Sequence, residues 1–158
     1  MSRVEKSVLV MHSAQQMWEL VDNIPEYPRF LPWCSGAEVS ERTPEQTIAT
    51  LHINFHGLRQ QFTTCNRSQP GKCLTMDLVR GPFQHLRGEF RFTPLNSQAC
   101  KISFALEWTF SSRLLEKVVG PVFHSIANSM VEAFVTRADQ VYTAALNALQ
   151  PPSAPSGA

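Results

Sequence analysis

The stretch from Pro121 to Leu149 constrains the fold of this chain more than any other segment. Its apolar residues recur every three or four positions, which is the spacing of one face of a helix. They are Val122, Phe123, Ile126, Ala127, Met130, Val131, Phe134, Ala138, Val141, Tyr142, Ala145 and Leu149. Polar residues from His124 to Asn147 fall on the opposite face, so we expect a helix that lies on a core with its back in water. At about 1.5 Å per residue it is roughly 40 Å long, enough to lie along a whole curved sheet.

The residues just before this helix, Ser112–Val119, are expected to form helical turns of their own. Gly120 and Pro121 then make the kink or join between the two pieces. Pro121 suits the first turn of the second piece, where a missing backbone N–H costs nothing.

At the other end of the chain, Val4–Met11 reads as a strand and Ser13 begins a helix. Ser13 and Gln16 have the spacing of a capping box, in which each side chain accepts a hydrogen bond from the backbone of the other. The helix is expected to bury Met17, Trp18, Leu20 and Val21 and to end at Asn23-Ile24-Pro25.

The segment Pro25–Gly36 carries three prolines and three aromatic residues, which allow at most a short helical turn. Connections are normally polar, whereas this one offers Tyr27, Phe30, Leu31 and Trp33. It must be covered by the sheet or present an apolar surface. We predict that it forms the lid or mouth of a cavity.

Six antiparallel strands are expected to follow, separated by turns rich in Gly, Pro, Asn and Ser. They are Ala37–Arg42, Thr47–His56, Leu58–Asn66, Cys73–Arg80, His85–Thr93 and Ala99–Phe110. Apolar and polar residues alternate within them, so one face is buried and the other is wet. The order predicts an α+β fold: a curved antiparallel sheet wrapped around the long C-terminal helix, in one domain over residues 1–149. The Pro- and Ser-rich tail, 150–158, is expected to be disordered.

Composition limits the classes of partner. A net charge of +1 gives no global field that would attract nucleic acid, and no DNA partner is expected. The N-terminus leads directly into a strand pattern, and no window approaches about eighteen uninterrupted apolar residues, so we expect neither a signal peptide nor a membrane span. The cysteines are expected to be buried, unpaired thiols in a reducing compartment: Cys34, Cys65, Cys73 and Cys100.

Several segments resemble the START-like family, and more closely its branch of coenzyme-Q-binding proteins and ribosome association toxins. The similarity runs from about Val4 to Ala145. The segments that carry it are Asp22–Cys34, Phe62–Asn66, Leu78–Gly88, Gly120–Phe123, Met130–Phe134 and Arg137-Ala138. The resemblance implies the helix-grip fold, a lipid-sized cavity between sheet and helix, and no known catalytic activity.

The same resemblance leaves two roles open. One is to bind a polyprenyl quinone (ubiquinone) or lipid, without a covalent cofactor, in support of respiratory electron transport. The other is that of a toxin that binds the large ribosomal subunit and blocks subunit joining and translation initiation. A cytoplasmic protein is expected, with peripheral contact with the inner membrane as a further expectation.

The residues themselves do not favour an enzyme or a metal site. The inward-facing strand positions hold neither paired acids nor a histidine beside an acid or nucleophile. His52 and His56 lie four residues apart on one strand, roughly 13 Å, too far to share one metal ion. His85 and His124 stand alone in the sequence.

A binding site for an apolar ligand fits better, because a strongly curved sheet and one helix rarely fill the space between them. We expect a volume of a few hundred Å³, as in ligand pockets generally. The candidate lining residues are Phe30, Leu31, Trp33, Phe55, Met76, Leu78, Phe90, Phe104, Phe123, Met130 and Phe134. The alternative is that these residues form an ordinary core.

For the ribosomal role, the candidate RNA-facing residues are Arg80 and Arg87, within a set of basic residues on the strands. Acidic residues such as Glu38, Asp77 and Glu89 are interspersed with them. A plain solvated face is therefore the alternative.

Overall fold

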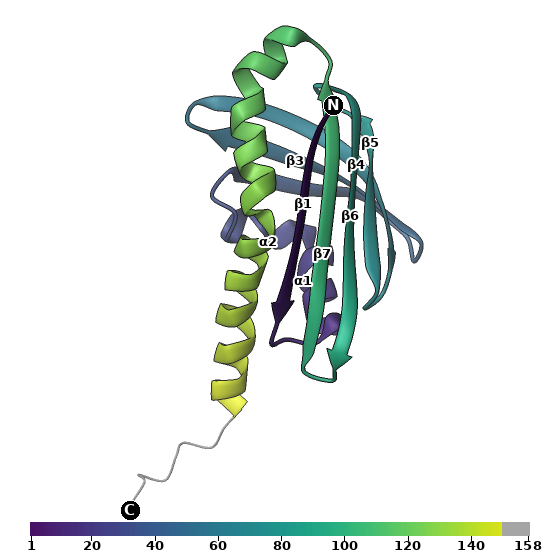
Figure 1. Ribbon diagram of the computed structural model, residues 1–158, viewed down its shortest axis with the longest axis vertical. Helices are drawn as coiled ribbons and strands as arrows, with labels where there is room; N and C mark the ends of the chain where they lie inside the picture. Colours follow the sequence, from purple (N-terminus) through teal and green to yellow (C-terminus); the bar gives the residue numbers. More distant parts are fainter. Residues whose placement is uncertain (150–158) are drawn as a thin grey trace, which may run out of the picture.

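The computed structural model describes residues 1–149, and their side chains as far as residue 142. A curved seven-stranded antiparallel sheet faces one long helix, α2 (Figure 1). The elements in chain order are β1 (Ser2–Val10), α1 (Ala14–Asp22), the 3-10 helix η1 (Ile24–Arg29), β2 (Cys34–Arg42), β3 (Gln46–Phe55), β4 (Leu58–Gln69), β5 (Cys73–Arg80), β6 (Phe83–Asn96), β7 (Ala99–Phe110) and α2 (Arg113–Leu149). The predicted α+β helix-grip class is confirmed. The predicted disorder of 150–158 concerns residues outside the described part.

The strand order is β1-β7-β6-β5-β4-β3-β2, so the first strand pairs with the last. Val4 lies opposite Leu106 and Val8 opposite Ile102 in this pairing. Strands β2 to β7 pair with their neighbours in sequence, as expected for a meander. Because β1 and β2 lie at opposite edges, α1 and η1 must carry the chain from one edge of the sheet to the other. Figure 1 shows β3 crossing the direction of β1 and β7, so that the sheet curls around α2.

The predicted capping box at the start of α1 is present. The Ser13 hydroxyl accepts a hydrogen bond from the Gln16 backbone N–H at 3.0 Å, and the Gln16 side chain accepts one from the Ser13 N–H at 3.0 Å. Met17 and Val21 are fully buried on the inner side of α1. The Trp18 indole donates to the carbonyl of Cys73, which ties α1 to β5.

The long helix differs from the expectation of two joined pieces. It continues from Arg113 through Gly120 and Pro121 to Leu149 as one element, so Pro121 lies in its interior rather than in a first turn. The Ser112 hydroxyl accepts a hydrogen bond from the Leu115 N–H and begins the helix. An interior proline removes one backbone hydrogen bond, a loss that packing of Val119 and Phe123 against the core offsets.

The C-terminal half of α2 is fastened to the N-terminal part of the chain. The Tyr142 hydroxyl donates to the carbonyl of Gln16 at 2.7 Å, and Asp139 lies 2.6 Å from the His12 imidazole. Burial, with a smaller contribution from the nearby Glu19, raises the pKa of Tyr142. These contacts set the position of α2 over the sheet.

One helix within residues 1–142 is long and apolar enough to cross a membrane, judged by length and composition alone. This is α2 over Arg113–Tyr142, with a mean hydropathy of 1.3 and 33% of the most apolar window buried in the fold. The sequence prediction of no membrane span rests on the lack of a long uninterrupted apolar run, whereas α2 meets a criterion of helix length and mean hydropathy. Since the core helix of a globular domain meets the same criterion, this is weak grounds for a span.

Candidate functional site

A cavity lies between the inner face of the sheet and α2, with a volume of about 40 Å³. The sheet supplies most of its wall, from alternate positions of five strands: Ala49 and Leu51 on β3, Phe62, Thr64 and Asn66 on β4, Met76 on β5, Leu86 and Phe90 on β6, Phe104 and Leu106 on β7. Alternate residues of a strand share one face, so this set follows from the pleat of the sheet.

The rest of the wall comes from α2 and from the Pro-rich segment. The helix contributes Phe123, Ile126, Ala127 and Met130, which share one face at helical spacing. The Pro-rich segment and the residue before it contribute Ile24, Tyr27 and Trp33. The segment therefore covers the cavity with two of its three aromatic side chains, Tyr27 and Trp33, which are both buried. Its role as a lid or mouth for a ligand stays a prediction.

The structure brings together six of the eleven residues predicted to line a cavity. They are Trp33, Met76, Phe90, Phe104, Phe123 and Met130. The other five are not among the residues that line it: Phe30, Leu31, Phe55, Leu78 and Phe134. Contact of any of these residues with a ligand remains a prediction.

Phe134 and Phe30 belong to an aromatic cluster beside the cavity. The Phe134 ring centroid lies 5.4 Å from that of Tyr27, 5.5 Å from that of Phe30 and 5.8 Å from that of Phe90. The Arg137 guanidinium covers the outer side of the Phe30 ring at 5.3 Å. This cluster fills the space next to the cavity toward the C-terminal half of α2.

The remaining three predicted residues are displaced for different reasons. Leu31 is fully buried in the core. Phe55 is the last residue of β3, where its ring lies 4.1 Å from that of His56. Leu78, near the end of β5, is half-buried at the rim of the inner face. Strand alternation assigns the face of a side chain correctly but not its distance from the cavity.

The expected volume of a few hundred Å³ is wrong. Aromatic and methionine side chains occupy most of the space that the curved sheet encloses, and about 40 Å³ remains. Met76 shows how: a Cβ on Gly88, its cross-strand partner, would lie only 2.6 Å from the Met76 Cε. Pockets for drug-sized ligands have volumes of about 300–1,000 Å³. A ligand of that size can enter only if flexible side chains such as Met76 and Met130 move.

Polar groups on the wall come from β4, a strand that supplies none of the predicted lining residues. Thr64 and Asn66 are both buried, and the Thr64 hydroxyl donates to the Asn66 side-chain oxygen at 2.7 Å. The segment Phe62–Asn66 was singled out only through its family resemblance. Because its inward positions are partly polar, apolar alternation gives no signal for them.

Among ionisable groups on the wall, Tyr27 donates its hydroxyl to the backbone carbonyl of Val21. Burial raises the pKa of Tyr27 far above its usual value. Among the side chains that the structure describes, residues 1–142, no group of three or more His, Cys, Asp and Glu is arranged to hold a metal ion.

The cysteines are free thiols, as expected, but differ in burial. Cys34 and Cys100 are buried, whereas Cys65 and Cys73 are half-buried, so the expectation of buried thiols is right for two of the four. Burial raises the pKa of the Cys34 thiol to about 11, against the smaller opposing effect of a hydrogen bond with the Gly36 backbone.

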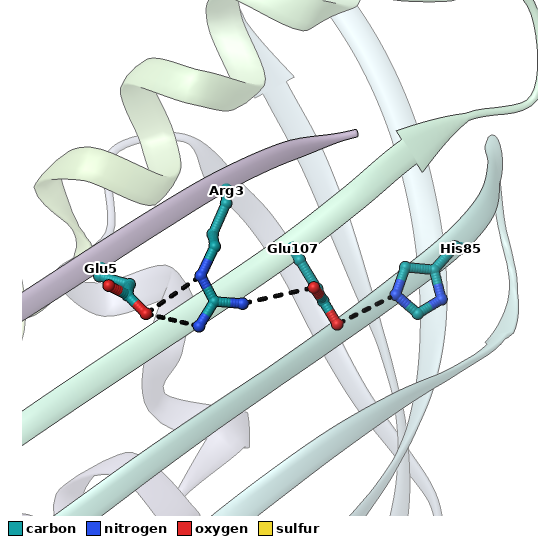
Figure 2. Close-up of polar contacts among 4 residues, drawn as sticks. All are labelled: Arg3, Glu5, His85 and Glu107. Atoms are coloured by element: carbon teal, nitrogen blue, oxygen red, sulfur yellow. Dashed lines mark hydrogen bonds and ion pairs between the residues drawn. The ribbon is translucent and has the colours of Figure 1, made fainter.

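The outer face of the sheet carries charges of both signs. Figure 2 shows the Arg3 guanidinium between the carboxylates of Glu5 and Glu107, with His85 against the second oxygen of Glu107 at 3.3 Å. Of the two predicted RNA-facing residues, Arg87 pairs with Asp77 at 3.4 Å, and Arg80 is exposed at the end of β5. Such compensated charges on a sheet are typical of a solvated face.

The sequence matches a protein family and several known proteins. A family model described as polyketide cyclase / dehydrase and lipid transport matches residues 10–135. The ribosome association toxin RatA of Vibrio cholerae is 44% identical over 142 residues, which cover 90% of this chain and 99% of that protein.

A more distant relative carries a different name. The mitochondrial coenzyme Q-binding protein COQ10 homolog B of Xenopus laevis is 26% identical over 141 residues, 87% of this chain and 58% of that protein. Among solved structures, a START superfamily protein from Mycobacterium smegmatis superposes with a TM-score of 0.71 at 20% identity, covering 88% of this chain and 98% of that one. At this identity the likeness shows the fold alone.

Proposed function

The chain belongs to the polyketide cyclase / dehydrase and lipid transport family, and we propose that it binds an apolar small molecule between the sheet and α2 without transforming it. The observation that supports this most is the composition of the cavity wall. Aromatic, aliphatic and methionine side chains form it, with Thr64 and Asn66 as a single hydrogen-bonded polar pair. Walls of this kind, with few polar groups, are typical of sites for hydrophobic ligands.

The leading ligand is a polyprenyl quinone such as ubiquinone. Support comes from the name of the Xenopus relative and from the many aromatic side chains against which a flat ring can pack. We place the protein in the cytoplasm, in peripheral contact with the inner membrane from which such a ligand would come.

The proposal of a non-enzymatic role rests on the wall residues. General acid–base catalysis needs a group that can exchange a proton with the substrate. The tyrosine on the wall, Tyr27, has its hydroxyl engaged by Val21 and its pKa raised by burial. The family also includes cyclases and dehydrases by description, so this part of the proposal is separate from binding.

Titration with a short-chain ubiquinone is expected to quench or shift the fluorescence of Trp33, because its indole is buried on the cavity wall. Trp18 and Trp108 also fluoresce, so the matched control is Trp33→Phe, which should bind with similar affinity by calorimetry but lose most of the response. A flat titration beside calorimetrically proven binding would remove the Pro-rich segment from the site.

A second candidate function is association with the large ribosomal subunit. It is supported by relatives named for this activity at 44% identity over nearly their whole length, closer than the coenzyme-Q-binding relative. This role would use the outer surface, whereas ligand binding uses the interior. The two can therefore be tested independently, and one does not exclude the other.

If Arg80 and Arg87 contact ribosomal RNA, co-sedimentation with large subunits should weaken steeply between low and moderate salt, since phosphate contacts release counterions. The double variant Arg80→Glu, Arg87→Glu should sediment less at low salt. Its matched control is Arg113→Glu, Lys117→Glu, the same charge change on the first turns of α2. If the amount of protein that co-sediments with large subunits changes neither with salt nor with the Arg80 and Arg87 substitutions, this electrostatic site is wrong.

A further inference from the structure

Asn66 is a polar residue on the cavity wall whose amide nitrogen has no hydrogen-bond partner among residues 1–142. It lies on the inner face of β4 and is only 6% exposed. Its side-chain oxygen accepts the Thr64 hydroxyl proton at 2.7 Å. Its amide nitrogen makes no hydrogen bond within residues 1–142, where every fully enclosed polar side-chain atom has a partner.

Because the amide nitrogen has no partner and no enclosed polar atom of the described side chains lacks one, the nitrogen must be in contact with open space, and Asn66 lines the cavity. Burying a polar group without a hydrogen bond destabilises the folded state, so apolar residues are the rule on such faces. The cross-strand partner of Asn66 on β5 is Met76. Thr64 lies two residues before Asn66 on β4 and faces the same side of the sheet. Since Thr64 donates its one hydroxyl proton to the oxygen, the two amide N–H groups remain free to donate to a molecule in the cavity.

The space for an occupant lies beside this amide. Met76, opposite Asn66, extends over Gly88, whose missing side chain leaves room for it. Methionine is flexible and moves at low cost. If Met76 swings aside, the volume above Gly88 joins the existing cavity and borders the Asn66 amide.

We propose that Asn66 determines ligand specificity by donating an N–H to a carbonyl oxygen on an apolar ring, while Thr64 fixes the orientation of the amide. The ligand class is thus a hydrophobic ring with a hydrogen-bond acceptor, as in a quinone, rather than a plain hydrocarbon or acyl chain. This inference rests on the proposed binding function and adds the residue that would recognise the carbonyl-bearing ring of the ligand.

The test uses two probes of one skeleton. Duroquinone is a fully methylated benzoquinone, and durene is the corresponding methylated benzene without carbonyls. Full methylation also blocks addition of the half-buried thiols of Cys65 and Cys73 to the quinone ring. Dissociation constants for both probes are measured by calorimetry with the wild type and with Asn66→Leu.

The ratio of the two constants, durene over duroquinone, should fall about tenfold in Asn66→Leu, the scale of one buried hydrogen bond. Durene affinity itself should change less than about twofold, since that probe cannot accept the bond. Thr63→Val is the matched control: its hydroxyl is equally buried but faces Thr50 on the other side of the sheet, and the ratio should not change. Should Asn66→Leu fail to fold by circular dichroism, Asn66→Val serves instead.

The outcomes separate the two levels of the hypothesis. An unchanged ratio in a folded Asn66 variant overturns the role of Asn66 while ligand binding stands. If the wild type binds neither probe, the proposed binding function falls and the inference with it. A ratio that falls equally in Thr63→Val would assign the effect to general loosening of β4 and also overturn the inference.

Discussion

Truncation of Phe134 to alanine is expected to lower the free energy of unfolding by about 3–5 kcal/mol, as for large-to-small changes in well-packed interiors. The Phe134 ring is 1% exposed and lies against the rings of Tyr27, Phe30 and Phe90. It does not line the cavity, so its truncation opens new space inside the aromatic cluster. Urea unfolding followed by circular dichroism measures the loss.

The matched control is Phe134→Leu, which keeps most of the apolar volume and should lose much less stability. A loss below about 1 kcal/mol in Phe134→Ala would show that the aromatic cluster is loosely packed. In that case the cavity extends to Phe134, as the sequence alone had suggested, and the account of a filled cluster beside a small cavity is wrong.

Replacing Gly88 by leucine is expected to weaken binding of a short-chain ubiquinone about tenfold or more. A Cβ at Gly88 already meets the Met76 Cε at 2.6 Å and the Leu106 Cδ1 at 3.0 Å, so a larger side chain must extend into the cavity. Overpacking a core costs about 1–3 kcal/mol. A ligand that needs the same space as the leucine side chain should lose a similar amount of binding free energy. Calorimetry measures the change.

Gly88→Ala provides a graded control, because one methyl group can be accommodated when the flexible end of Met76 moves. Its binding should lie between those of the wild type and Gly88→Leu. Unchanged binding in a folded Gly88→Leu protein would place the ligand elsewhere, for example in the outer groove beside Phe30 and Arg137.

The fold was predictable because its signals are local and periodic. Alternation in segments such as Ile102–Phe110 and helical spacing from Val122 onward identify the sheet and α2, and Ser13 with Gln16 marks the start of α1. The pairing of β1 with β7 has no such signal. It follows from closing the sheet around α2, which is a property of the whole chain.

The site was predictable only in part. Periodicity gives the face of Met76 or Phe104 but not the depth of Phe55 at the end of β3 or of Leu78 near the end of β5. The volume depends on rotamers, such as that of Met76 over Gly88, which no sequence pattern encodes. Asn66 escaped notice because a polar residue in a strand ordinarily indicates the wet face.

The central claim is that the interior binds an apolar molecule, and native mass spectrometry tests it most directly. The wild type and Gly88→Leu are purified from the protein's own cells, and each is measured before and after incubation with a short-chain ubiquinone. We expect the wild type to carry a mass adduct that organic extraction identifies as a quinone or lipid, or to gain one on incubation, while Gly88→Leu carries much less. A wild type that shows no adduct in either measurement, like Gly88→Leu, would contradict the account.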